Sequence, residues 1–121
     1  MIKYKQFAIL PKQPKMSCGK RCSQIAHATF LALDKSWNDD KDTNLLIEKW
    51  KRNGMCVIVL QCKDTNQLKN IANYLRYWDI PHHLYHDEGL TEVEPFVPTA
   101  LATGILTEDK FWIFEKLKLY K

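Results

Sequence analysis

The sequence predicts a three-layer α/β domain, with about four strands in one sheet and helices on both faces. Short apolar stretches alternate along the chain with stretches of helical periodicity, and this alternation is typical of the α/β class. The chain has 121 residues, of which 45% are hydrophobic, so it can form one compact core but is too short for two ordinary domains. We therefore expect a single domain over residues 1–121.

The first expected strand covers residues 3–10, and Pro11 and Pro14 are expected to end it because proline lacks the N–H that a strand requires. A helix is expected from about residue 20 to residue 33, before the polar stretch 34–42. The residues at helical spacing that should face the core are Ile25, Ala28, Thr29 and Ala32.

A second helix, capped by Asp42 or Thr43, is expected to continue to about Arg52, because Leu46, Ile47 and Trp50 recur at intervals of three and four and Asn53-Gly54 then stops it. Residues 55–62 then form the clearest strand. Their sequence, MCVIVLQC, is apolar on both faces, as expected of a central strand covered on each side.

The second half of the chain continues the alternation. A third helix is expected to begin at Asp64 or Thr65 and to end before Pro81, since proline disfavours helix in the residue before it. Short strands are expected at residues 82–85 and 99–103, on either side of a loop. Thr107 should introduce a terminal helix over residues 108–117. Trp50 and Trp112 are expected to be core or interface anchors.

Composition restricts the compartment and the partners. With 26% charged residues, the chain has no apolar run near the roughly 20 residues that cross a bilayer, and its start does not resemble a signal peptide. We therefore expect a cytoplasmic protein without a membrane partner. The net charge of +4 favours an anionic partner but does not require one.

The four cysteines do not have the paired CxxC spacing of zinc sites, so reduced thiols and no structural metal are expected. The sequence also lacks the GxSxG, HExxH, GxxxxGK[ST] and GxGxxG motifs of other enzyme and nucleotide-binding classes.

One cluster of polar residues lies at the start of the first expected helix. At 100° per residue, Lys20, Gln24 and His27 fall within an arc of about 60°. The N–H groups at a helix start, together with Lys20 and Arg21, can hold an anion, and Lys12 and Lys15 extend the basic surface. On spacing alone, a solvated helix face explains the same pattern.

A second cluster follows the expected strand at residues 82–85, where open α/β sheets commonly bind ligands. In the sequence HDEGLT, Asp87 could orient a group or accept a proton, and Thr91 could donate a hydrogen bond. An ordinary turn is the alternative interpretation, because Asp and Gly are frequent in turns.

The two clusters belong to motifs, GKxxxQxxHA at residues 19–28 and HDEGLTEVEPxxPT at residues 86–99. Together with WKRNG and MCVIVLQC between them, they resemble the type-2 peptidyl-tRNA hydrolases of archaea and eukaryotes. The resemblance implies a mixed four-stranded sheet sandwiched by helices, a homodimer, and no metal or other cofactor. The implied reaction is hydrolysis of the ester between a peptide and the terminal ribose of tRNA, so peptidyl-tRNA is the expected substrate.

The resemblance also implies the site. The expected catalytic residues are Lys20, Gln24, His27, Asp87, Thr91 and Thr99, and the expected substrate- or RNA-binding residues are Gly19, Lys12, Lys15 and Arg21. A lysine and helix-terminal N–H groups suit the negative charge that develops on the ester carbonyl oxygen. Asp87 would position water or hold Lys20.

Some positions depart from the family pattern, and these are Cys18, Phe96, Val97-Pro98 and Ile105. Three other functions therefore stay open: an RNA-binding module without activity, a protein-interaction regulator on the same fold, and hydrolysis of another small acyl substrate.

Overall fold

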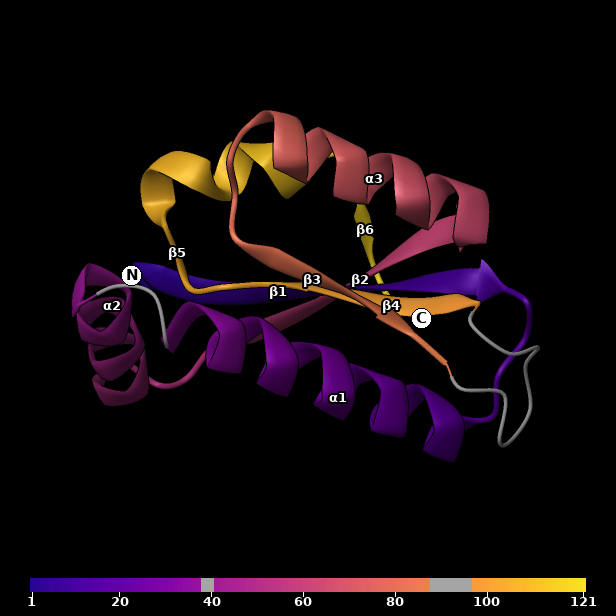
Figure 1. Cartoon of the computed structure of the whole chain (residues 1–121), viewed down its shortest axis with the longest axis horizontal. Coiled ribbons are helices and arrows are strands. Elements are labelled where there is room, and N and C mark those ends of the chain that lie inside the picture. The colour runs from indigo at the N-terminus through magenta and orange to yellow at the C-terminus, as the bar shows by residue number, and fades with distance from the viewer. Residues whose placement is uncertain (38–40, 88–96) are drawn as a thin grey trace.

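The protein is seen here as a computed structural model, which describes residues 1–37, 41–87 and 97–121, except for the side chains of residues 35–37. A twisted sheet separates two layers of helices (Figure 1). Helix α1 (Cys18–Trp37) covers one face, and α3 (Thr65–Tyr77) and the 3₁₀ helix η1 (Glu108–Phe114) cover the other. Helix α2 (Lys41–Arg52) packs at one end. The expected α/β class with helices on both faces is confirmed.

The sheet is mixed, as expected. Its order is β3-β4-β1-β2-β6, with β5 paired to β1. Strands β1 (Tyr4–Gln13) and β2 (Val57–Asp64) are parallel, and β4 (Pro98–Thr103) is antiparallel to both β1 and β3 (His82–His86). Strands β5 (Leu106–Thr107) and β6 (Lys118–Leu119) have two residues each. The expected number of four strands was wrong, because the described residues form six. A two-residue strand is too short to show a sequence period.

The strand expected at residues 55–62 is confirmed as β2, which pairs with β1 on one side and with β6 on the other, but it is only partly covered on its two faces. All six residues of β4 are buried, whereas in β2 only Leu60 and Cys62 are. Side chains alternate across the sheet, with Leu101 packed toward α3 and Ala100 and Ala102 toward α1. The small alanines face Ala28 and Ala32, which allows α1 to lie close to the sheet at the site described below.

Strand β1 continues through Pro11 to Gln13, and Pro11 is paired with Cys62 of β2. The expected end at Pro11 was therefore wrong. Among the described residues, the pairing of β1 with β4 is confined to Ala8 and Ile9. Pro11 consequently lies where β1 has a paired neighbour on one side, and a sheet tolerates proline at such an edge-like position.

The helix boundaries agree in part with expectation. The side chain of Asp64 accepts a hydrogen bond of 2.9 Å from the N–H of Gln67, which confirms the expected cap of α3. Helix α1 is longer at both ends than the expected 20–33. The expected terminal helix over 108–117 was wrong, because residues 108–114 form a 3₁₀ helix and residues 118–119 a strand. Among the described residues, no helix is long and apolar enough to cross a membrane.

The two tryptophans expected to be core or interface anchors differ. Trp50 is buried beside Ile47 and Ile105, and its indole N–H donates to the carbonyl of Cys56 at 2.9 Å. Trp112 is 46% exposed, so it lies outside the core, and its role at an interface stays a prediction. It makes an edge-to-face contact with Trp78, at the end of α3.

Candidate active site

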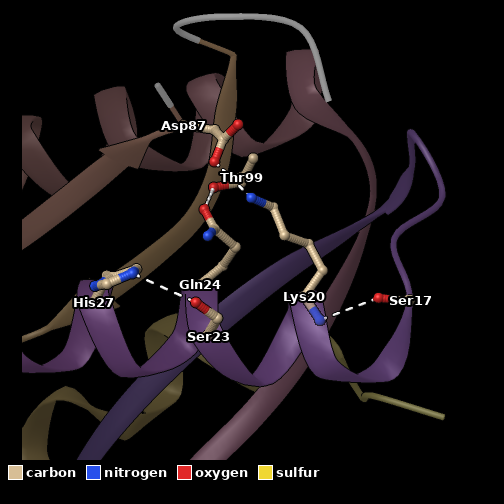
Figure 2. A network of polar contacts seen from close by, with 7 residues as sticks. All are labelled: Ser17, Lys20, Ser23, Gln24, His27, Asp87 and Thr99. Carbon is tan, nitrogen blue, oxygen red and sulfur yellow. Dashed lines mark hydrogen bonds and ion pairs between the residues drawn. The ribbon is translucent and has the colours of Figure 1, made fainter. Parts of the chain in front are cut away.

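The site is built around the first turn of α1, where Ser17 acts as the cap. The backbone N–H of Lys20 donates to the hydroxyl of Ser17 at 3.2 Å, and the N–H of Arg21 donates to the carbonyl of Ser17 at 2.9 Å. A serine in this position occupies one of the N–H groups that a helix start leaves without a helical partner. The capped turn directs the Lys20 side chain toward the end of β3 (Figure 2).

A buried ion pair joins Lys20 to Asp87, the residue that follows β3. The ammonium nitrogen of Lys20 lies 2.7 Å from Oδ1 of Asp87, and the two side chains are 7% and 6% exposed. The backbone N–H of Asp87 donates to the carbonyl of Val97 at 2.9 Å, and this hydrogen bond holds the backbone of Asp87 in position. Burial of a charge is costly unless an opposite charge compensates it. The pair therefore holds both side chains in place next to a helix N-terminus.

A second buried contact lies beside the pair. The hydroxyl of Thr99, in β4, donates a hydrogen bond to Oε1 of Gln24, one turn of α1 beyond Lys20. Gln24 is 2% exposed and Thr99 is 1% exposed. Figure 2 shows the side chains of Lys20, Gln24, Asp87 and Thr99 pointing toward one another from α1, from the end of β3 and from β4. Segments far apart in the sequence thus bring four of the six expected catalytic residues together.

His27 occupies the outer part of the same helix face. Its side chain is exposed, its Nε2 lies 3.4 Å from the hydroxyl of Ser23, and its ring stacks on Tyr85 at 4.9 Å between centroids. These contacts do not include Lys20 or Asp87, so His27 lies at the border of the site rather than at the ion pair. Thr91, the sixth expected catalytic residue, lies outside the described residues.

The expected substrate-binding residues lie around the start of α1. Gly19 is exposed in the first turn, and apart from its chain neighbours and the adjacent helix backbone, a methyl group added to its Cα would meet no atom within 4 Å. Lys15 is exposed in the loop before the helix. Lys12 and Arg21 both lie over the ring of Tyr120, with their cations 4.5 Å and 5.2 Å from its centroid.

Sequence reasoning missed Ser17 and Tyr120. A serine three residues before Lys20 is a usual cap, but the helix was expected to begin at Lys20, which concealed this signal. Tyr120 follows a strand of two residues and carries no motif that marks it.

The arrangement suits a reaction in which negative charge develops. An ammonium group and helix N–H groups, held in fixed positions and partly screened from water, stabilise an oxyanion more strongly than water does. The adjacent carboxylate of Asp87 can orient the ammonium or accept a hydrogen bond from water. Within the described residues, no group of three His, Cys, Asp or Glu side chains is arranged to hold a metal ion.

Solved structures include one with a similar fold, a protein of unknown function from Agrobacterium tumefaciens strain C58. It superposes with a TM-score of 0.63, and the alignment covers the whole of both chains. Its sequence identity of 14% means that the likeness concerns the fold alone.

Sequence relatives are closer. Proteins named peptidyl-tRNA hydrolase share 34% identity over 107 residues in Methanopyrus kandleri and 33% over 110 residues in Pyrobaculum aerophilum; each alignment covers 88% of this chain and 89% of the relative. The protein of the same name from Thermococcus onnurineus is 30% identical over 109 residues, 90% of each chain.

The family model described as "Peptidyl-tRNA hydrolase PTH2" matches residues 4–120, a range that includes every site residue named above. This match over nearly the whole chain, together with relatives that align along most of their length, shows that the chain belongs to the PTH2 family of peptidyl-tRNA hydrolases.

Proposed function

We propose that this PTH2 hydrolase cleaves the ester between a peptide, or an N-blocked amino acid, and the 3′-terminal ribose of tRNA, and that Lys20 and Asp87 carry the reaction. The observation that supports this proposal most directly is the buried ion pair of 2.7 Å at the capped start of α1. Water adds to the ester carbonyl carbon, and the bond from this carbon to the ribose oxygen breaks. One proton of the water goes to the leaving ribose oxygen, which becomes a hydroxyl, and the other goes to solvent, so that the peptide leaves as a carboxylate.

Lys20 is proposed to stabilise the oxygen that becomes negative when water adds. The removal of one such donor typically lowers turnover by a factor of about 10² to 10³. Asp87 is proposed to hold the Lys20 ammonium and to position the attacking water, for which its carboxylate offers acceptor sites. Because water attacks directly, no covalent intermediate with the protein is required.

Gln24 and Thr99 are proposed to position the reacting groups, since both are buried and bonded to each other beside the pair. Thr91 is proposed as a further hydrogen-bond donor, on the motif HDEGLT alone. His27 is proposed to contact the substrate at the border of the site, where its exposed ring is held by Tyr85.

The tRNA is proposed to approach along the basic start of α1. Lys15 and Arg21, with Lys12 at the end of β1, offer positive charge to phosphates, and this contact carries little sequence information. Exposed Gly19 leaves space for close approach of the substrate to the helix start.

We further propose that residues 1–121 form one domain, supported by the family match over residues 4–120. The cytoplasm is the proposed compartment, supported by the four cysteines, all within the described residues and all free thiols. A homodimer is proposed from the family resemblance, with the exposed aromatic rings of Trp78 and Trp112 as supporting observation. Light scattering should give twice the 14.3 kDa of one chain.

The function is tested with N-acetyl-aminoacyl-tRNA labelled in its acyl group. Purified protein should release the label and leave intact tRNA, and Lys20→Ala and Asp87→Asn should each lower kcat by about 100-fold or more. Binding of tRNA without release of the label would instead support an RNA-binding module.

A further inference from the structure

A groove rich in lysine lies where β1 and β2 end, next to β6. Its volume is about 280 Å³. Four lysines line it, Lys12, Lys63, Lys116 and Lys118, and we call it the lysine groove. An adjoining hollow of about 430 Å³ shares Lys118 and adds Lys121. The feature therefore gathers five of the chain's positive charges on one edge of the sheet.

Nearby groups offset only part of this charge. The carboxylate of Asp64 follows Lys63 in the chain and accepts the N–H of Gln67 at the cap of α3, and its charge also acts on Cys62. The ammonium of Lys12 donates to the carbonyl of Lys121 at 2.6 Å. Burial raises the pKa of the Cys62 thiol to about 11, so this lining residue is neutral at physiological pH. Within the described part of the chain, none of the four groove lysines forms an ion pair. Three of them, Lys63, Lys116 and Lys118, are exposed to solvent.

Tyr120 links the groove to the start of α1, because a lysine of the groove and an arginine of α1 both lie over its ring. Lys12, which lines the groove, lies 4.5 Å from the centroid of the Tyr120 ring, and Arg21 lies 5.2 Å from it. Arg21 directly follows Lys20 in α1. The backbone N–H of Tyr120 donates to the carbonyl of Val59 in β2 at 3.0 Å, which fixes its position against the sheet. Figure 1 shows the ends of β1 and β2 at the same end of the molecule as the start of α1.

We propose that the lysine groove binds phosphate groups in the backbone of the tRNA while the 3′ end of that tRNA enters the site at Lys20. The proposal rests on the proposed function and names the part of the protein that holds the rest of the substrate. Flexible exposed ammonium groups suit backbone phosphates, because such contacts need charge but not a fixed geometry. A surface of this kind binds tRNA largely without regard to its sequence.

The groove variant combines Lys63→Gln, Lys116→Gln and Lys118→Gln. The control variant combines Lys41→Gln, Lys49→Gln and Lys51→Gln, which removes the same charge from exposed positions on α2, at the other end of the molecule (Figure 1). Thermal unfolding checks that both variants fold. A third variant with arginine at the three groove positions keeps the charge and should bind tRNA as the wild type does.

Binding of deacylated tRNA is measured between 50 and 200 mM KCl. Three phosphate contacts contribute about 2.7 to the slope of log affinity against log salt, so the wild-type affinity should fall about 40-fold more than that of the groove variant over this range. The control variant should keep the wild-type slope. Equal slopes for the groove and control variants would overturn the proposal.

Kinetics separate this proposal from the proposed function. With N-acetyl-aminoacyl-tRNA, the groove variant should show a raised KM and a wild-type kcat. With an N-acetyl-aminoacyl ester of adenosine, which lacks the rest of the tRNA, the groove variant and the wild type should have equal kcat/KM. Absence of turnover by the wild type would overturn the proposed hydrolase activity, and the tRNA-binding data would still test whether the groove binds phosphates. Wild-type turnover with an unchanged KM in the groove variant would overturn the groove alone.

Discussion

The ammonium nitrogen of Lys20 lies 2.7 Å from the carboxylate of Asp87, and the two side chains are 7% and 6% exposed. Sixty-seven positions separate them in the sequence, and the pairing of β3 with β4 together with the packing of α1 brings them together. Because both charges are buried, each depends on the other for compensation. The same contact that stabilises the fold thus holds the proposed catalytic lysine.

Loss of the lysine alone should destabilise the fold. In Lys20→Met the Asp87 carboxylate is left buried without its cation, and such a loss typically costs about 3–5 kcal/mol of unfolding free energy. Urea denaturation measures this change. The double variant Lys20→Met/Asp87→Asn should recover part of the stability but none of the turnover. If Lys20→Met were as stable as the wild type, the buried Asp87 carboxylate would not depend on the Lys20 ammonium for compensation.

Gly19→Ala should separate substrate binding from folding. Apart from its chain neighbours and the adjacent helix backbone, the added methyl group meets no atom within 4 Å, and alanine in a helix is more stable than glycine by about 0.5–1 kcal/mol. The variant should therefore unfold at the same or a higher temperature. If the substrate approaches the helix start closely, the kcat/KM of the variant should fall nonetheless. A displacement of the substrate by about 1 Å should lower it by about tenfold or more. Unchanged kinetics would remove Gly19 from the binding surface.

His27→Phe should have a smaller effect than the Lys20 variants. Phenylalanine can keep the stack on Tyr85, and His27 makes its hydrogen-bonding contact with Ser23 rather than with Asp87. We expect kcat to stay within about tenfold of the wild type, below the range of a donor at the reacting oxygen. Steady-state kinetics with N-acetyl-aminoacyl-tRNA measure it. A loss of kcat as large as that of Lys20→Ala would instead place His27 among the residues that contact the reacting atoms.

Cys62 should react slowly with iodoacetamide. Its pKa is raised from 9.0 to about 11, first by burial and then by the nearby charge of Asp64. Because the thiolate is the reactive form, at pH 8 this shift alone lowers the reactive fraction about 100-fold. Cys18 and Cys22 are exposed and should be labelled first. Mass spectrometry of the labelled protein measures the order in which the cysteines react. Early labelling of Cys62 in the folded protein would contradict its burial.

The sequence predicts the long elements well and the short ones badly. Helices α1 and α3 repeat apolar residues over several turns, and Asp64 marks a helix start by a local hydrogen bond, so these signals lie within one segment. Strands β5 and β6 have two residues each, and whether they pair depends on neighbours elsewhere in the chain. The 3₁₀ form of residues 108–114 is likewise not visible in a helical period.

The candidate site divides in the same way. Helical spacing alone places Lys20, Gln24 and His27 on one face of α1. The approach of Asp87 and Thr99 to that face is a tertiary contact, which the family resemblance implied and which spacing could not show. Tyr120 was missed because its contacts, with Lys12 and Arg21, also come from distant segments.

The most direct test of the central claim is the release of a labelled N-acetyl-aminoacyl group from tRNA by the wild type and by Lys20→Ala, both in EDTA. We predict wild-type turnover that EDTA does not abolish, because Lys20 and helix N–H groups are proposed to stabilise the developing charge. We also predict that folded Lys20→Ala loses about 100-fold or more in kcat. Equal turnover by the two proteins would contradict the assignment of Lys20 to the active site.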